Sequence, residues 1–222
     1  MAESGEHSQD SIKQSASDSV RQGEDVRERV RDLTLNALTS RRFDRDDIRE
    51  VIRAITEGAS LGAEGSHAGS TRNSLAEALR GMDQALAKSV QAGQEAIRRL
   101  LDVGRGVSER ELQQALDGLQ KIEEDFVTTV SQVAESAGER VRPELREAVG
   151  QATKAGTETG RQVAATVTEL TRTFAGTSFK ATLAGIEIGG EFGVRFAQIA
   201  SGVLSGMAAA LDKSSGEAKK NP

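Results

Sequence analysis

Residues 148–213 consist of six consecutive units of eleven residues, AVGQATKAGTE, TGRQVAATVTE, LTRTFAGTSFK, ATLAGIEIGGE, FGVRFAQIASG and VLSGMAAALDK. Eleven residues complete three turns at about 3.67 residues per turn, so this period predicts a straight or slightly right-handed helix. Positions 1, 5 and 8 of each unit then fall within roughly 65° of one another around the helix axis. The segment therefore predicts a long helical region with one continuous stripe of side chains.

This stripe is uncharged, because every charged residue of the segment lies at another position of its unit. An uncharged stripe favours contact between the helix and an apolar surface. The same pattern also suits packing against other helices of a soluble bundle. The large members of the stripe, which are the candidate surface-binding residues, are Leu170, Phe174, Ile188, Phe192, Phe196, Ile199, Val203 and Met207.

Three glycines four residues apart, Gly185, Gly189 and Gly193, lie in the same region. Small residues at this spacing allow two helix backbones to approach closely, as in GxxxG contacts. We therefore expect these glycines to pack against another helix, either in the same chain or in a second copy.

The uncharged run 196–211 is the nearest approach to a membrane span. Its helix would be about 24 Å long, against roughly 30 Å of bilayer hydrocarbon. Charged residues at Glu187, Glu191 and Arg195 prevent its extension toward the N-terminus. An interfacial helix is therefore expected rather than a transmembrane one.

Residues 74–142 predict a helical hairpin. Ser74–Glu77 matches a capping box, and a second one, Ser108–Glu111, follows the break at 103–106. Apolar residues keep helical spacing on both sides of that break. They are Leu75, Leu79, Met82, Leu86, Gly93 and Leu100, then Leu112, Leu116, Leu119, Ile122, Phe126, Val130, Val133 and Ala137.

The remaining segments complete the predicted organisation. Residues 1–24 and 213–222 are polar and are expected to be disordered tails. Residues 25–62 predict two short helices, the second capped by Asp44 and ended by Gly58 and Gly62, with a linker at 63–73. Pro143 opens the last region, 143–212, either in the first turn of a new helix or at a kink or short joint, which we favour.

The composition agrees with an all-α, elongated fold: a helical hairpin or bundle followed by a long amphipathic C-terminal region of 11-residue periodicity. Only 36% of the 222 residues are hydrophobic and 3% aromatic, which is poor material for a thick core. Two prolines leave long uninterrupted stretches of helix-forming residues. The 23 glycines oppose helix formation, so we expect close helix contacts or a helix that forms only with a partner.

No enzymatic or nucleic-acid function is expected. The net charge of -5 and the scarcity of aromatic residues disfavour nucleic acid. The only histidines, His7 and His67, lie in polar segments, and no cysteine, nucleophile motif or phosphate-binding motif is present. The acidic run 123–125 is more typical of a solvated helix face than of a cation site. We therefore assign no catalytic residue, metal, cofactor or small-molecule substrate.

The chain resembles an uncharacterised family of small all-helical proteobacterial proteins of unknown function. The resemblance rests on RRFDRDDIREVIRAITEGASLGA (41–63), KIEEDF (121–126), ERVRPELREAV (139–149), TGRQVAATVTELT (159–171) and EFGVRFAQIASGVLSGM (191–207). It implies an all-helical fold and no established activity. In composition, the C-terminal third is also similar to phasins, which coat polyhydroxyalkanoate granules, and to late-embryogenesis-abundant proteins with 11-residue repeats.

Two functions remain open at this stage. In the first, a phasin-like, non-enzymatic protein self-associates and coats an apolar surface, either a polyhydroxyalkanoate granule or a membrane interface. In the second, the chain is a soluble homo-oligomeric coiled-coil scaffold with no lipid contact, in which identical copies cover the stripe. The N-terminus lacks a signal-peptide pattern, so we expect a cytoplasmic protein, which the first function would place at the periphery of a granule or the inner membrane.

Overall fold

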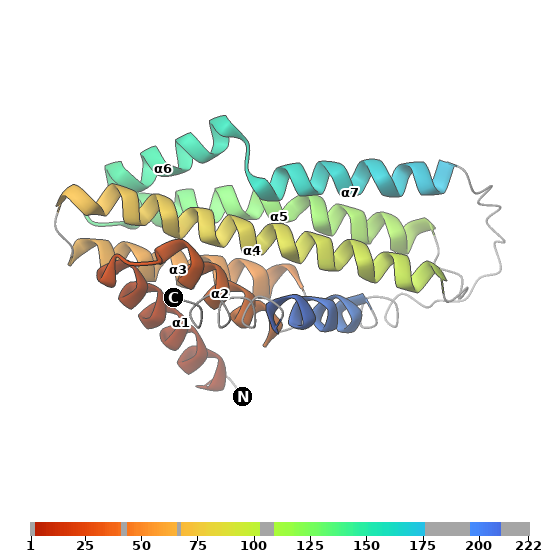
Figure 1. Ribbon diagram of the computed structural model, residues 1–222, viewed down its shortest axis with the longest axis horizontal. Helices are drawn as coiled ribbons and strands as arrows, with labels where there is room; N and C mark the ends of the chain where they lie inside the picture. Colours follow the sequence, from red (N-terminus) through yellow and green to blue (C-terminus); the bar gives the residue numbers. More distant parts are fainter. Residues whose placement is uncertain (1–2, 41–43, 66–67, 103–108, 176–195, 210–222) are drawn as a thin grey trace, which may run out of the picture.

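The computed structural model describes residues 3–40, 44–65, 68–102, 109–175 and 196–209. They form helices and turns without a strand, so the fold is all-α as expected. Figure 1 shows an elongated bundle. The helices are α1 (Glu3–Gln22), α2 (Val26–Thr39), α3 (Arg45–Glu64), α4 (Ala68–Asp102), α5 (Glu109–Ser136), α6 (Arg142–Ala155) and α7 (Glu158–Ala175), and a further helix spans 196–209.

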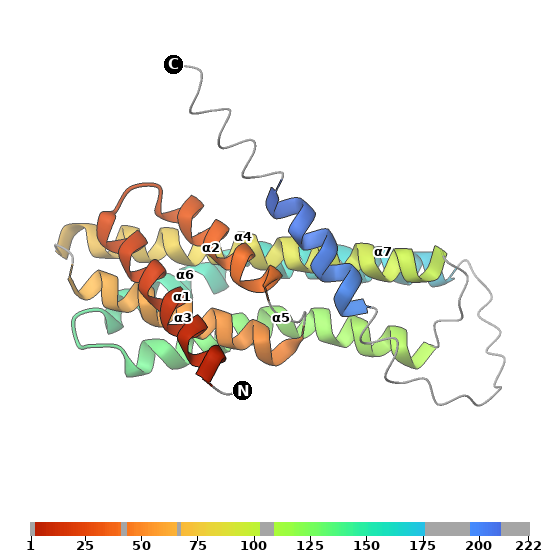
Figure 2. The same cartoon turned by 90° about the horizontal axis from the view of Figure 1, so that it is seen from below.

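The helices are arranged in layers around α4 and α5, which run in opposite directions along the long axis (Figure 1). On one side, α2 packs on α4 and α3 packs on α5, with α1 outside α3. On the other side, α6 and α7 follow one another over α4 and α5. The helix at 196–209 crosses the bundle on the side of α2 (Figure 2). The predicted hairpin is therefore the central layer.

Helix α4 is the centre of the core. Its 35 residues extend for roughly 50 Å, and the apolar positions expected from the sequence are buried except Leu100, which is half-buried. Small side chains such as Ala85, Ser89, Ala92 and Ala96 are also fully buried, which lets neighbouring helices approach α4 closely. Its exposed positions are few because neighbours lie on most of its sides. Burial of this kind, at about 25 cal/mol per Å² of apolar surface, is the main source of stability.

The expected disordered tail at 1–24 is wrong for 3–22, where the chain forms α1. Ile12, Ala16 and Val20 lie four residues apart on one side of this helix and are buried. A helix with so few apolar residues is marginal alone, so α1 depends on its contact with α3. The ion pair between Lys13 and Glu57, at 2.9 Å, adds to this contact.

Helix α3 begins as expected and ends later than expected. The Asp44 carboxylate accepts a hydrogen bond of 2.9 Å from the Asp47 backbone N–H, as in an N-cap. However, Gly58 and Gly62 do not end the helix, which continues to Glu64. The reason is tertiary: both glycines are in contact with α1, and the packing there offsets their poor helix propensity.

The expected linker at 63–73 is also largely helical. Helix α3 runs to Glu64 and α4 begins at Ala68, so the predicted capping box at Ser74–Glu77 lies inside α4. Ser74 is buried there, where it packs in the bundle instead of capping a helix. The second predicted box includes Ser108, which lies outside the described residues, and α5 begins at Glu109.

The region 143–212 is not one rod. Pro143 occupies the first turn of α6, and a short joint at 137–141 separates this helix from α5. The new helix and the short joint are therefore confirmed, whereas a kink within one continuous helix is wrong. Helix α6 ends at Ala155 and α7 begins at Glu158, with Gly156 between them at φ 76°. The predicted tail at 213–222 and the segment 176–195 lie outside the described residues.

Candidate functional site: the C-terminal apolar stripe

The stripe predicted from the 11-residue period is the buried side of α7. Stripe positions in this helix are Thr159, Val163, Thr166 and Leu170, and these four residues are at most 7% exposed. Residues between them, except for half-buried flanking positions, are exposed. The side of α7 that carries the stripe therefore packs against α4 and α5 in the same chain.

In the helix at 196–209 the stripe borders the buried side. Phe196, Ile199, Val203 and Met207 are partly buried and pack against the core. The fully buried residues are Ala200 and Leu204, one position beyond Ile199 and Val203. A helix of 14 residues with no charged side chain presents Gln198, Gly202, Ser205, Gly206 and Ala209 outward.

The remaining predicted residues of this site lie outside what the structure describes. These are the side chain of Phe174, the stripe residues Ile188 and Phe192, and the helix-packing residues Gly185, Gly189 and Gly193. Among the described candidates, the four stripe residues of 196–209 lie together on one side of the α4–α5 layer, and α7 with Leu170 lies on the other side.

Polar contacts flank the buried stripe of α7. The Thr166 hydroxyl donates to Gln94 Oε1 at 2.9 Å, and the Gln91 amide donates to Gln162 Oε1 at 3.1 Å. Near the end of α7, the Glu169 carboxylate accepts from the Gln94 amide and pairs with Arg98. The α4–α7 interface thus combines a narrow apolar centre with groups that water can also satisfy.

Carboxylates from two neighbouring helices hold the first turn of α7. Asp83 of α4 accepts hydrogen bonds from the backbone N–H groups of Glu158, at 2.7 Å, and Thr159, at 2.9 Å. From α5, Glu123 accepts from the Thr157 hydroxyl at 2.6 Å. The two bonds to Asp83 satisfy N–H groups that a helix leaves unpaired at its start, and both carboxylates place negative charge at the positive end of the helix dipole.

A cleft of about 370 Å³ lies beside the joint between α6 and α7. Leu79 and Phe126, both nearly fully buried, contribute apolar surface to it. Around them are Arg80, Asp83 and Arg161, among other polar residues. The charges of the two arginines and of the carboxylates are balanced, and Arg161 donates to the Gly156 carbonyl at 2.8 Å. This arrangement presents no set of convergent groups typical of a catalytic centre.

The acidic run 123–125 has a structural role that the sequence interpretation missed. Asp125 is 4% exposed and accepts two hydrogen bonds from Arg45, at 2.5 and 2.7 Å. Arg49 pairs with the same carboxylate at 3.3 Å. The hydrogen bond to Asp125 raises the pKa of Arg45 above its ordinary value. These contacts join α3 to α5, so the run is only partly a solvated face.

In the described part of the chain, close helix contacts occur at glycines that the sequence analysis had not singled out for packing. Gly58 and Gly62 form a GxxxG pair, and a Cβ at Gly58 would lie 2.8 Å from Ala16 Cβ in α1. Gly81 of α4 is equally close to α2, since a Cβ there would lie 3.0 Å from the Arg31 backbone nitrogen. The four-residue spacing of Gly58 and Gly62 within an apolar helix was the available signal.

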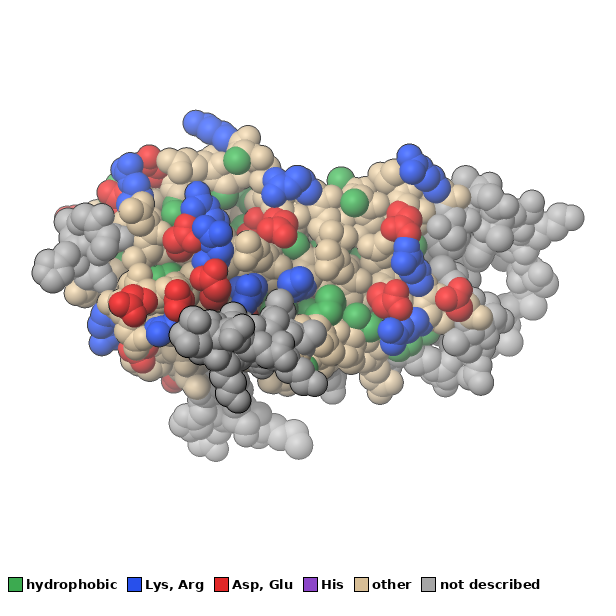
Figure 3. Space-filling model, in the orientation of Figure 1, with side chains coloured by type: hydrophobic (Ala, Val, Ile, Leu, Met, Phe, Trp, Pro, Cys, Tyr) green, Lys and Arg blue, Asp and Glu red, His purple; other side chains and the backbone are tan. Residues whose placement is uncertain are grey.

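Within the described ranges, no group of histidine, cysteine and carboxylate side chains has a geometry suited to a metal ion. None of the described helices combines the length and the apolar character needed to cross a bilayer. The surface in Figure 3 mixes charges of both signs, with hydrophobic atoms in small separate areas. Leu61 is the single large hydrophobic residue with high exposure in the described part of the chain.

Comparison with known proteins places the chain in a family without assigning it an activity. No curated protein and no solved structure shows a significant match. A family model does match, over residues 1–213, and its description is "Family of unknown function". The matched region includes every described helix, and the chain therefore belongs to this family of unknown function, DUF6781.

Proposed function

We propose that this protein is a non-enzymatic, phasin-like helical bundle that self-associates and coats an apolar surface, using the stripe near its C-terminus. The observation that supports this function best is the helix at 196–209. It has no charged residue, and Phe196, Ile199, Val203 and Met207 are only partly buried. A fully buried Ile or Phe side chain contributes about 1.5–3 kcal/mol, so a few such residues suffice for reversible adsorption.

A neutral polyester surface, such as a polyhydroxyalkanoate granule, suits this helix better than an anionic membrane. Interfacial membrane helices are typically rich in Lys and Arg on their polar side. The helix at 196–209 has none, and the whole chain has a net charge of -5. Repulsion from anionic headgroups would therefore oppose adsorption, whereas a polyester surface lacks them.

Co-sedimentation with poly(3-hydroxybutyrate) particles tests this function. The variant Ile199→Asp/Val203→Asp places charge on the stripe and is expected to lower the bound fraction at least tenfold. The matched control Gln198→Asp/Ser205→Asp adds the same charge at exposed positions of the same helix, and is expected to bind within twofold of the wild type. Circular dichroism checks that both variants stay folded. Equal recovery of the wild type and the stripe variant would exclude adsorption through this helix, and anionic vesicles form a parallel arm for the membrane alternative.

A soluble homo-oligomeric scaffold is the second candidate. It is favoured by the burial of the α7 stripe inside the chain and by the scarcity of large exposed apolar residues in the described part. Because α4 is enclosed by its neighbours, contacts between copies would use the outer surfaces of the bundle. Light scattering separates the candidates: a monodisperse oligomer that binds neither polyester particles nor vesicles supports the scaffold and opposes the coat.

A further inference from the structure

We propose that α7 is a releasable arm, which pivots at Gly156 and exposes the apolar stripe that the closed bundle buries. This inference rests on the proposed function, since it states how a surface gains access to stripe residues such as Val163 and Leu170. Both are nearly fully buried against α4 and α5 in the closed form. Without release, the helix at 196–209 would be the part of the described stripe that reaches a surface.

The joint between α6 and α7 is suited to a pivot. Only Gly156 and Thr157 separate the two helices, and Gly156 has φ 76° and ψ 132°, outside the helical region. Glycine changes its backbone angles at little steric cost, and hinges are typically a few residues at the ends of elements. A Cβ at Gly156 would meet only the Arg161 guanidinium, at 3.8 Å, so apolar packing does not fix the joint. The contacts that hold it are hydrogen bonds, from Arg161 to the Gly156 carbonyl and from the first turn of α7 to Asp83, and water can replace them when α7 moves.

The interface between α7 and the central helices α4 and α5 is suited to reversible separation. Two of its four buried stripe residues, Thr159 and Thr166, carry hydroxyl groups. The flanking contacts of Gln94 and Glu169 are hydrogen bonds and ion pairs, and water replaces such partners when the surfaces separate. Among the described side chains of α7, opening therefore exposes two large buried apolar residues, Val163 and Leu170, and the half-buried Val167.

Helix α3, which packs on the opposite side of the central layer, provides the contrast. Its buried side is formed by branched apolar residues, including Val51, Ile52 and Ile55, all with no exposed surface. Its glycines also hold α1 at close range. Separation of α3 would expose far more apolar surface, so α7 is expected to leave the central layer before α3 does.

A reversible cross-link, or staple, between α7 and α4 tests whether α7 must be released. Because the chain contains no cysteine, two engineered cysteines would be the only thiols that react with a cross-linker. The pair Gln91→Cys/Gln162→Cys links α4 to α7 at side chains that are 3.1 Å apart in the native protein. The control pair Arg72→Cys/Glu147→Cys links α4 to α6, on the other side of the pivot, where an ion pair of 2.6 Å is present. Each folded full-length variant is cross-linked with a bis-maleimide whose spacer contains a cleavable disulfide, then mixed with poly(3-hydroxybutyrate) particles.

The α4–α7 staple is expected to reduce the bound fraction at least tenfold, and cleavage of the spacer to restore it. The α4–α6 staple is expected to leave binding within twofold of the unlinked protein. Equal binding of both stapled proteins would overturn the arm and leave surface coating intact. If the unlinked proteins and the wild type also fail to bind, the proposed function itself is wrong.

Discussion

Gly58 in α3 lies directly against the Lys13 backbone carbonyl oxygen in α1, in a space that no Cβ atom could share. The Ala16 side chain approaches the same point, at 2.8 Å from where a Cβ would be. The contact explains why a polar N-terminal segment folds as a helix: its backbone and small residues fit against glycines of α3.

The substitution Gly58→Ala tests this contact. Added volume at a packed helix crossing forces the helices apart, and such overpacking costs about 1–3 kcal/mol. Urea unfolding should show this loss, together with faster hydrogen exchange in α1. The matched control is Gly118→Ala in α5, where no described atom lies within 4 Å. There the same change should stabilise the helix by about 0.5–1 kcal/mol, so two variants of equal stability would contradict the assignment.

Substitutions of the two arginines that contact Asp125 between α3 and α5 are predicted to lower the free energy of unfolding by different amounts. Arg45→Ala removes two hydrogen bonds from a carboxylate that stays buried, and should measurably lower the free energy of unfolding. Arg49→Ala removes one longer contact and should cost less. A double-mutant cycle with Asp125→Ala isolates the coupling, and additive effects would show that the pairs contribute nothing.

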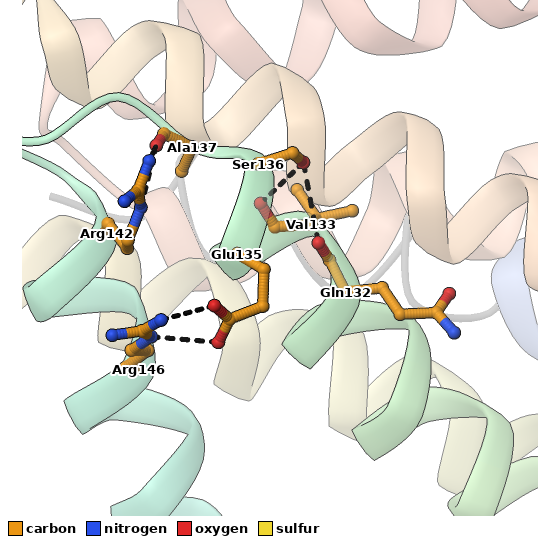
Figure 4. Close-up of polar contacts among 7 residues, drawn as sticks. All are labelled: Gln132, Val133, Glu135, Ser136, Ala137, Arg142 and Arg146. Atoms are coloured by element: carbon orange, nitrogen blue, oxygen red, sulfur yellow. Dashed lines mark hydrogen bonds and ion pairs between the residues drawn. The ribbon is translucent and has the colours of Figure 1, made fainter.

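The turn between α5 and α6 predicts a dependence of stability on pH. Figure 4 shows Glu135 paired with Arg146 and the Arg142 guanidinium donating to the Ala137 carbonyl. The hydrogen bond from Arg146 lowers the pKa of Glu135 below its ordinary value of 4.5. This pair therefore stabilises the folded protein fully above pH 4.5, and the effect is lost as the pH falls through the lowered pKa.

Glu135→Gln removes this titration. The variant should be less stable than the wild type at pH 7, and the difference should shrink toward zero as the pH falls below the lowered pKa. Thermal unfolding at a series of pH values measures both curves. Because the pair is solvent-exposed, high salt should also reduce the difference. A difference that stays constant from pH 7 to pH 3 would show that another interaction of Glu135 is responsible.

Local patterns in the sequence predicted the parts of the fold that local forces decide. The apolar spacing that includes Leu75 and Leu86 identified the central hairpin, and Asp44 identified the start of α3. Within α7, the 11-residue period selected the buried positions, including Val163 and Leu170. In each case the helix's own side chains determine which side is buried.

Tertiary contacts decided the rest. Because glycine has a low helix propensity, the sequence predicted that the helix ends near Gly58. The contact with α1 overrides this local preference. The break at Gly156 lies inside an uninterrupted 11-residue period, so the period did not predict it. A new helix start is stabilised there because Asp83, in another helix, accepts hydrogen bonds from the first turn of α7. A period specifies which side of a helix is apolar, but neither the partner that covers it nor the length of the helix.

The hydrogen bonds that Asp83 accepts from the first turn of α7 are predicted to stabilise the closed position of this helix. Asp83→Ala removes acceptors from the Glu158 and Thr159 N–H groups and should destabilise the closed position of α7 by about 1 kcal/mol. Hydrogen exchange should be faster at these two amides. If adsorption requires release of α7, the same variant should bind polyester particles up to about fivefold more tightly, since 1.4 kcal/mol corresponds to a factor of ten. Asp83→Asn keeps a side-chain oxygen and should fall between the wild type and Asp83→Ala. Faster exchange without tighter binding would show that α7 does not limit adsorption.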